Sequence, residues 1–148
     1  MLLEEINIEN ILPQAHPFIM IDRVVDFKKG EYLTAVKNVT ANEWFFKNAG
    51  PMPYLPETLL IEAAAQTAVL FARLTLIENH SGNYLFVLGR INAEFEGRAG
   101  VGDQVLLKTS NFKMMKMNGF IDVGIESETG AIAKLNIFYS LMENKPHG

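Results

Sequence analysis

The sequence contains no cysteine, which excludes disulfide bonds, thiol nucleophiles and thiolate metal sites. Only three histidines are present, and none has partners at metal-ligand or triad spacing, so we expect neither a metal site nor a cofactor. Basic runs are also missing and the formal net charge is −4, which argues against a nucleic-acid-binding surface. The longest apolar stretches are interrupted by Glu62 and Arg73, so no membrane span is expected. The acidic N-terminus does not resemble a secretory signal, and we therefore expect a cytoplasmic protein.

The 148 residues are 49% hydrophobic and 20% charged, which is the balance of a globular chain with a sizeable core. With no internal repeat or linker, the sequence predicts one domain over residues 1–148. Hydrophobic periodicity and turn residues predict the order of its elements. The sequence predicts a short helix over residues 6–11, strands over 18–27 and 32–39, a helical turn over 42–46, and a long apolar helix over 56–78 that ends in the stretch 79–83.

The rest of the chain alternates apolar and polar residues with a period of two, around residues 91–95, 121–125 and 133–139. This period is typical of half-buried antiparallel strands. Asn118-Gly119 and Thr129-Gly130 are placed at the predicted hairpin turns between them. The sequence therefore predicts an α+β fold in which three or four antiparallel strands, with the first two, wrap around the long helix and bury it.

The long helix carries one feature that points to chemistry. Glu62 stands on a helix face that is otherwise almost entirely apolar, and a buried carboxylate is costly unless it is paired or used. The helix begins at Leu55-Pro56, so its N-cap position offers no side-chain oxygen to the first N–H groups. Open donors about two turns before a carboxylate could hold a carbonyl oxygen beside a proton-transferring group. The alternative is a structural Glu62 that is satisfied by Gln66, one turn later.

Four segments in order resemble one family over nearly the whole chain. They are LPQAHPFIMIDRV at residues 12–24, AVKNVTANEWFF at 35–46, PYLPETLLIEAAAQ at 53–66 and VGDQV at 101–105. Together they are similar to the motifs of the β-hydroxyacyl-acyl-carrier-protein dehydratases of fatty-acid synthesis. The resemblance implies the hotdog fold, an antiparallel sheet wrapped around one long central helix, and a dimer or a higher homo-oligomer with sites at the interface between subunits.

The family dehydrates with a His and a Glu, and the resemblance implies that the Glu is Glu62. The position of the His falls on Asn48, in a loop that is one residue shorter than in the family. An amide cannot accept a proton at neutral pH, although it can orient a water or a carbonyl. The Gly whose N–H the family aims at the thioester carbonyl is also absent, and Glu57 stands at that position. Asn48 could equally be a loop residue that makes turn hydrogen bonds.

The resemblance further implies a ligand in the class of acyl thioesters, carried by acyl carrier protein or coenzyme A. Its carbonyl would lie over the helix N-terminus near Glu57, with Gln66 close by. Phe46, Tyr54 and Leu59 are candidates to line the acyl chain, although core packing would explain the same residue types. Only Arg98 remains of the cations with which the family meets its acidic carrier, and Glu94 and Glu96 stand beside it. This favours coenzyme A as the carrier, or a different partner protein.

Three functions remain open from the sequence. The first is a dehydratase of 3-hydroxyacyl thioesters with reduced or altered activity, in which Glu62 handles the proton. The second is a non-catalytic partner subunit that binds acyl thioesters. The third is a thioesterase in which Glu62 activates water and Asn48 orients it.

Overall fold

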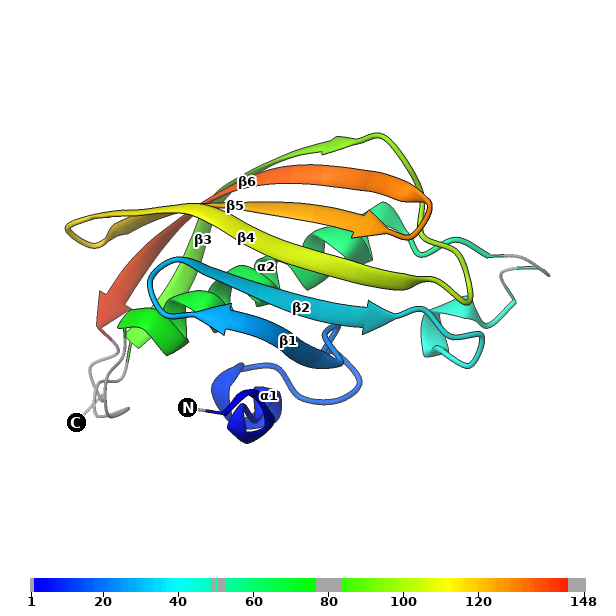
Figure 1. Cartoon of the computed structure of the whole chain (residues 1–148), viewed down its shortest axis with the longest axis horizontal. Helices are drawn as coiled ribbons and strands as arrows, with labels where there is room; N and C mark the ends of the chain where they lie inside the picture. The colour runs from blue at the N-terminus through cyan, green and yellow to red at the C-terminus, as the bar shows by residue number, and fades with distance from the viewer. Residues whose placement is uncertain (1, 49, 51–52, 77–83, 144–148) are drawn as a thin grey trace.

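One long helix and six antiparallel strands form the body of the protein in a computed structural model, which describes residues 2–48, 50, 53–76 and 84–143. The 3₁₀ turns are η1 (Leu3–Glu5) and η2 (Trp44–Phe46), and the helices are α1 (Ile8–Ile11) and α2 (Glu57–Leu76). The strands are β1 (Arg23–Lys28), β2 (Tyr32–Asn38), β3 (Tyr84–Phe95), β4 (Gln104–Met115), β5 (Asn118–Ser127) and β6 (Gly130–Glu143). They form a single sheet in the order β1-β2-β4-β5-β6-β3, which arches over α2 (Figure 1).

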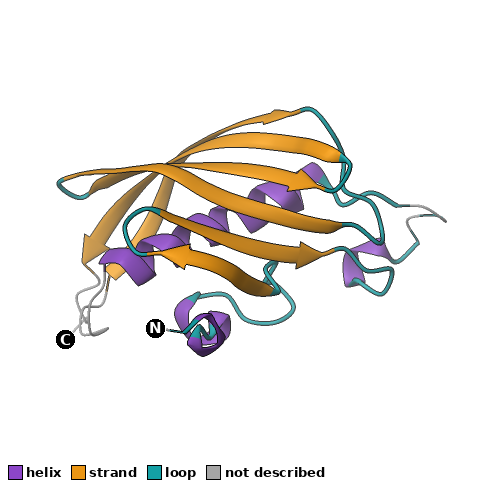
Figure 2. Ribbon diagram, viewed as in Figure 1, coloured by secondary structure: helices purple, strands orange, loops and turns teal. Residues whose placement is uncertain are grey.

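Helix α2 lies under the sheet because it has apolar side chains on most sides, and the predicted central helix is confirmed (Figure 2). Ala63, Ala64, Ala68 and Ala72 are at most 1% exposed, and their small side chains let the sheet approach the helix closely. By length and composition alone α2 could cross a membrane, but 61% of its most apolar window is buried within this domain. The helix therefore serves as the core of the fold.

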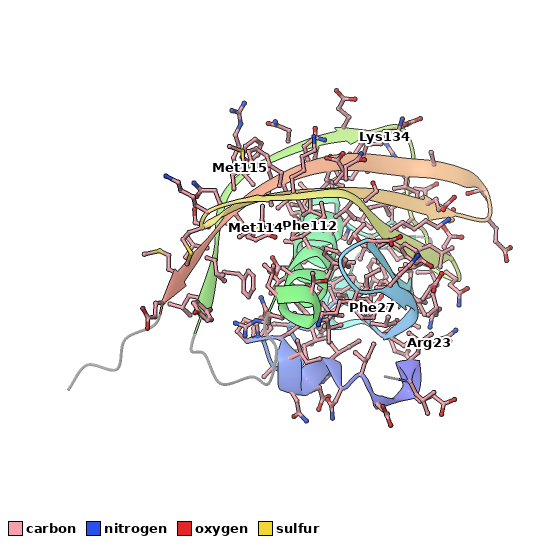
Figure 3. All side chains as sticks on the ribbon, turned by 60° about the vertical axis from the view of Figure 1, so that its left-hand side comes forward. Arg23, Phe27, Phe112, Met114, Met115 and Lys134 are labelled. Carbon is pink, nitrogen blue, oxygen red and sulfur yellow. The ribbon has the colours of Figure 1, made fainter. Side chains whose placement is uncertain are left out.

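The predicted alternation along the late strands is confirmed by their burial. Ile121, Val123 and Ile125 of β5 are at most 2% exposed and face the helix. Figure 3 shows Phe112 on this inner side of the sheet and Lys134 on the outer side. Phe112 packs edge-on against Phe71 of α2 with ring centroids 5.1 Å apart, so strand β4 is joined to the helix by aromatic contact as well as aliphatic packing.

Both predicted hairpin turns lie one or two residues too late. Lys116 and Met117 form the β4–β5 turn, and Glu128 and Thr129 form the β5–β6 turn. Lys116 supplies the left-handed backbone with φ 57°, and Asn118-Gly119 is already inside β5. Gly119 has a packing role instead, because a Cβ there would lie 2.3 Å from the Tyr139 ring. The Asn-Gly pair was thus mistaken for a turn signal.

Other predicted boundaries shift in the same way. The strand expected from residue 18 begins at Arg23, because the backbone of Phe18 and Met20 bonds to the side chain of Gln66 instead of a neighbouring strand. The first helix covers only residues 8–11, with a separate 3₁₀ turn before it. Helix α2 is described to Leu76, so the end expected near residue 78 and the stretch 79–83 lie outside the described residues. The loop predicted at 49–53 is described only at Gly50 and Pro53.

Tyr139 makes the stability of the fold sensitive to alkaline pH. Burial raises its pKa to about 12, and its hydroxyl donates only a weak bond to Met114 Sδ at 3.9 Å. An unfolded tyrosine ionises near pH 10, so the unfolded chain loses this proton first as the pH rises. We expect the burial of protonated Tyr139 to stabilise the fold fully below pH 10. This stabilisation should be lost between about pH 10 and 12. Denaturant unfolding at pH 9, 10 and 11 measures this loss.

Tyr139→Phe removes the ionisable hydroxyl and should flatten that part of the pH dependence. Tyr32→Phe is the matched control, since its hydroxyl contacts Asp26 at 3.5 Å at the surface. Equal alkaline loss in the wild type and in Tyr139→Phe would contradict the assignment.

Candidate active site

Glu62 lies in the first half of α2, on a side of the helix that the sheet does not fully cover, and is half-buried. Its Oε1 accepts a hydrogen bond from Gln66 Nε2 at 2.9 Å, which is the i, i+4 contact of one helical turn. No ion pair of Glu62 is found among the described residues. The carboxylate is thus held on one oxygen by a neutral donor, and no hydrogen bond to its other oxygen is recorded within the described residues.

Gln66 is only 1% exposed, and both polar atoms of its side-chain amide form hydrogen bonds within the protein. Nε2 also donates to the carbonyl of Phe18 at 2.8 Å, and Oε1 accepts from the backbone N–H of Met20 at 2.8 Å. This side chain therefore joins the helix that carries Glu62 to the segment before β1. Within one chain, the polar atoms of Gln66 are therefore bonded to Glu62, Phe18 and Met20, and its predicted place close to a ligand stays a prediction.

Helix α2 starts where the sequence predicts, directly after Pro56. Pro56 O accepts from the N–H groups of Leu59 and Leu60 at 3.0 and 3.1 Å, and no side-chain cap of the first turn is recorded within the described residues. Glu57 is exposed in this first turn, where the helix dipole favours an acidic side chain. Leu59 is half-buried, three residues before Glu62.

The segment that enters α2 is attached to the loop before β4. Leu55 N–H donates to Ala99 O at 2.7 Å, and Tyr54 forms an isolated bridge with Gly100. The Tyr54 side chain is 56% exposed, and the guanidinium of Arg98 lies over its ring at 5.1 Å from the centroid. An aromatic side chain and a cation thus lie together on the surface at this end of the domain.

Asn48 follows the turn η2 and is exposed, with a left-handed backbone at φ 67°. Figure 1 shows η2 and the start of α2 at the same end of the domain. Phe46, the last residue of η2, is 7% exposed and packs against Phe45 with centroids 4.7 Å apart, so within one chain it belongs to the core. No hydrogen bond between Asn48 and Glu62 is found in the described part of the chain.

Two contacts that sequence reasoning did not find hold η2 in place. Lys37 is 6% exposed and forms an ion pair with Glu43, whose other oxygen accepts from Thr40 N–H at 3.1 Å. Trp44 Nε1 donates to the carbonyl of Pro17 at 3.2 Å. Lys37 and Glu43 both lie in the segment 35–46 that carries the family resemblance, which was the one signal available for them.

Two cavities open on the surface of the single chain. A cavity of about 700 Å³ lies between the N-terminal segment and β1, and one of about 480 Å³ lies beside His16, Asp22, Lys37 and Trp44. Neither is lined by Glu62 or Asn48. Within the described residues, no cluster of three or more His, Asp or Glu side chains could hold a metal ion.

Comparison with known proteins finds relatives that match most of the chain. A FabA-like domain model matches residues 12–133. The 3-hydroxyacyl-acyl-carrier-protein dehydratase FabZ of Shewanella denitrificans is 46% identical over 96 residues, which cover 64% of this chain and 63% of that protein. FabZ of Haemophilus influenzae is 37% identical over 135 residues, which cover 90% of this chain and 85% of that protein.

Among solved structures, the dehydratase heterocomplex ApeI:P from Xenorhabdus doucetiae matches with a TM-score of 0.74 at 12% identity, covering 95% of this chain and 93% of that chain. At this identity the likeness concerns the fold alone. The arrangement, one antiparallel sheet around one long helix, is the hotdog fold that the sequence predicted.

Proposed function

Because the chain belongs to the FabA-like domain family, we propose that it is a dehydratase of 3-hydroxyacyl thioesters in acyl-chain biosynthesis, with reduced or altered activity. The observation that carries the proposal is Glu62, a half-buried carboxylate on the core helix that is held by one oxygen and has no described ion pair. The thioester is carried by acyl carrier protein or coenzyme A. Its carbonyl lies over the open start of α2 near Glu57.

In the proposed reaction, the Cα–H and Cβ–O bonds of the substrate break, a Cα=Cβ double bond forms, and water leaves. Glu62 gives its proton to the departing hydroxyl, which leaves as water. The α-proton passes to a water molecule that Asn48 orients, because the amide of Asn48 cannot accept a proton at neutral pH, and solvent then returns a proton to Glu62. We therefore propose slow dehydration, because a positioned base contributes about 10²–10⁴-fold to rate.

The site is completed by a second copy of the chain in this proposal, with Asn48 of one subunit facing Glu62 of the other. Strand β3 is at one edge of the sheet and leaves Leu85, Val87 and Leu88 40–46% exposed. An uncovered edge of this kind is a ready pairing surface. On α2, Leu59 and Val69 are half-buried on either side of Glu62 and would be covered by a partner. Tyr54 and Phe46 lie at the end of the domain where the acyl thioester enters.

The test is an assay of the purified protein with a 3-hydroxyacyl thioester and the matched saturated acyl thioester, each on acyl carrier protein and on coenzyme A. Chromatography of the products separates the outcomes. The enoyl thioester from the hydroxylated substrate alone supports the proposal. Free thiol from both substrates would instead identify a thioesterase.

A second function is favoured by Asn48, which stands where the family has its base. If neither product forms while the saturated thioester binds in calorimetry, the chain is a thioester-binding partner subunit. Addition of a separate dehydratase subunit would then be needed for enoyl product.

A further inference from the structure

Three exposed methionines gather at the end of the sheet opposite to the candidate active site. Met115 ends β4 and is 69% exposed, Met117 in the turn that follows is 45% exposed, and Met142 near the end of β6 is 54% exposed. Figure 1 shows the β4–β5 turn projecting from the sheet, at the other end of the domain from η2 and the start of α2. Figure 3 shows Met115 on the side of the sheet away from α2. Large apolar side chains gathered on a surface indicate an interaction site.

Two aromatic rings extend this apolar surface along the outer face of the sheet. Phe120 of β5 and Phe138 of β6 are direct cross-strand partners, with ring centroids 4.1 Å apart. They alternate with Ile121 and Ile137, which are 1% exposed on the inner face, so both rings lie on the outer face. We call these side chains together the methionine patch: Met115, Met117, Phe120, Phe138 and Met142.

Cations flank the methionine patch on both sides. Lys113 of β4 is the cross-strand partner of Phe120. Arg90 of β3 is the partner of Phe138, so one row across four strands consists of Lys, Phe, Phe and Arg on the same face. Lys116 is exposed in the β4–β5 turn itself. No ion pair of these three cations is recorded among the described residues.

The acidic residues that adjoin the patch along its strands do not neutralise these cations. Both oxygens of Asp122 are occupied, because they accept from Asn111 Nδ2 at 2.8 Å and from Asn136 Nδ2 at 2.7 Å. Glu143 follows Met142 and so alternates to the other face of β6. The patch therefore combines apolar groups with positive charge. Two copies of it placed face to face would bring like charges together, which disfavours self-association through this surface.

We propose that the methionine patch docks the protein on an anionic lipid surface. The acyl region of a bilayer accepts the Met and Phe side chains, while the headgroup phosphates meet Lys113, Lys116 and Arg90. Neither cavity described above is lined by patch residues, and a helical partner protein normally binds in a groove. A projecting turn with flexible thioethers needs no surface of matching shape. A second copy paired at the edge of β3 would extend the sheet and leave its outer face open.

Sedimentation of the purified protein with vesicles tests the proposal. We expect binding to vesicles that contain phosphatidylglycerol and little binding to vesicles of phosphatidylcholine alone. Binding should weaken as the salt concentration rises, because the attraction of the cations to the surface is screened. No binding to either kind of vesicle, or equal binding to both, would overturn the proposal. The outcome does not depend on the proposed dehydratase activity.

The double variant Lys113→Gln with Lys116→Gln should lower the partition coefficient on phosphatidylglycerol vesicles about 20-fold, because each cation near an anionic surface contributes about fivefold. Lys134→Gln is the matched control, since Lys134 is exposed on the same outer face but lies away from the patch (Figure 3). We expect less than a twofold change for it. An equal loss per charge at Lys134 would indicate attraction by net charge alone and would overturn the proposal.

Met115→Ser should weaken vesicle binding at least about fivefold, because it removes an inserted apolar side chain. Leu2→Ser is its control, since Leu2 is 67% exposed against 69% for Met115 and lies outside the patch. Equal thermal unfolding midpoints show that both variants keep the fold. The competing occupant is an acidic protein. If acyl carrier protein binds in calorimetry and is lost in the double lysine variant, while vesicles do not bind, the patch is a protein docking site and the lipid proposal is overturned.

Discussion

Glu62→Gln should lower the rate of 3-hydroxyacyl-thioester dehydration by about 10²–10⁴-fold, the contribution typical of a positioned acid or base. The substituted amide keeps the size of the side chain and can still accept from Gln66 Nε2, as the carboxylate does at 2.9 Å. It cannot give a proton to the departing hydroxyl. We therefore expect kcat to collapse while KM changes little, measured with the enoyl product as the signal.

Glu128→Gln is a suitable control for this variant, because Glu128 is exposed in the β5–β6 turn and its loss removes the same charge from the chain. We expect wild-type kinetics for it. Thermal unfolding should give the same midpoint within a few degrees for the wild type and both variants. Activity that survives in Glu62→Gln would remove the carboxylate from the mechanism and leave the site unassigned.

The period of the apolar residues was enough to predict most of the fold. Strands β5 and β6 alternate apolar and polar residues, and α2 is apolar on most sides. Both patterns are satisfied when the inner face of one sheet covers a single helix. Turn positions were less predictable, because Gly119 is required by the Tyr139 ring and Lys116 takes the left-handed backbone. Glycine can mark tight packing as well as a turn, and a single sequence does not separate the two.

The contacts of the candidate site were likewise only partly predictable from the sequence. Local spacing pointed to the Glu62–Gln66 contact as the structural alternative for Glu62, since residues four apart on a helix are neighbours. The contacts of Gln66 with Phe18 and Met20 span 46 to 48 residues and depend on the tertiary fold. The Lys37–Glu43 pair was missed for another reason: charged residues near the end of a strand and at the start of a short turn normally indicate a solvated surface. The pairing of Asn48 with Glu62 stays a prediction, because it needs a second subunit.

Asn48→His should raise the dehydration rate at least about 10²-fold, because it supplies a base near the pH of the assay where the wild type has an amide. The backbone of Asn48 is left-handed at φ 67°, a region in which Asn, Asp and His are all enriched, so the substitution introduces little strain. Rates at pH 7 to 8, where an imidazole is largely neutral, measure the gain. Asn48→Ala is the control without a base and should show none.

The same substitution tests whether the site is shared between subunits. A double variant, Asn48→His with Glu62→Gln, carries the imidazole but no acid, and we expect it to be inactive alone. Unfolded and refolded together with the wild type, it forms mixed dimers in which its imidazole faces the partner's Glu62. Those dimers should recover about the per-site rate of the Asn48→His enzyme, because one of their two sites holds both groups. If both groups acted within one chain, no mixed dimer would contain a complete pair, and the mixture would show only wild-type activity diluted by the double variant.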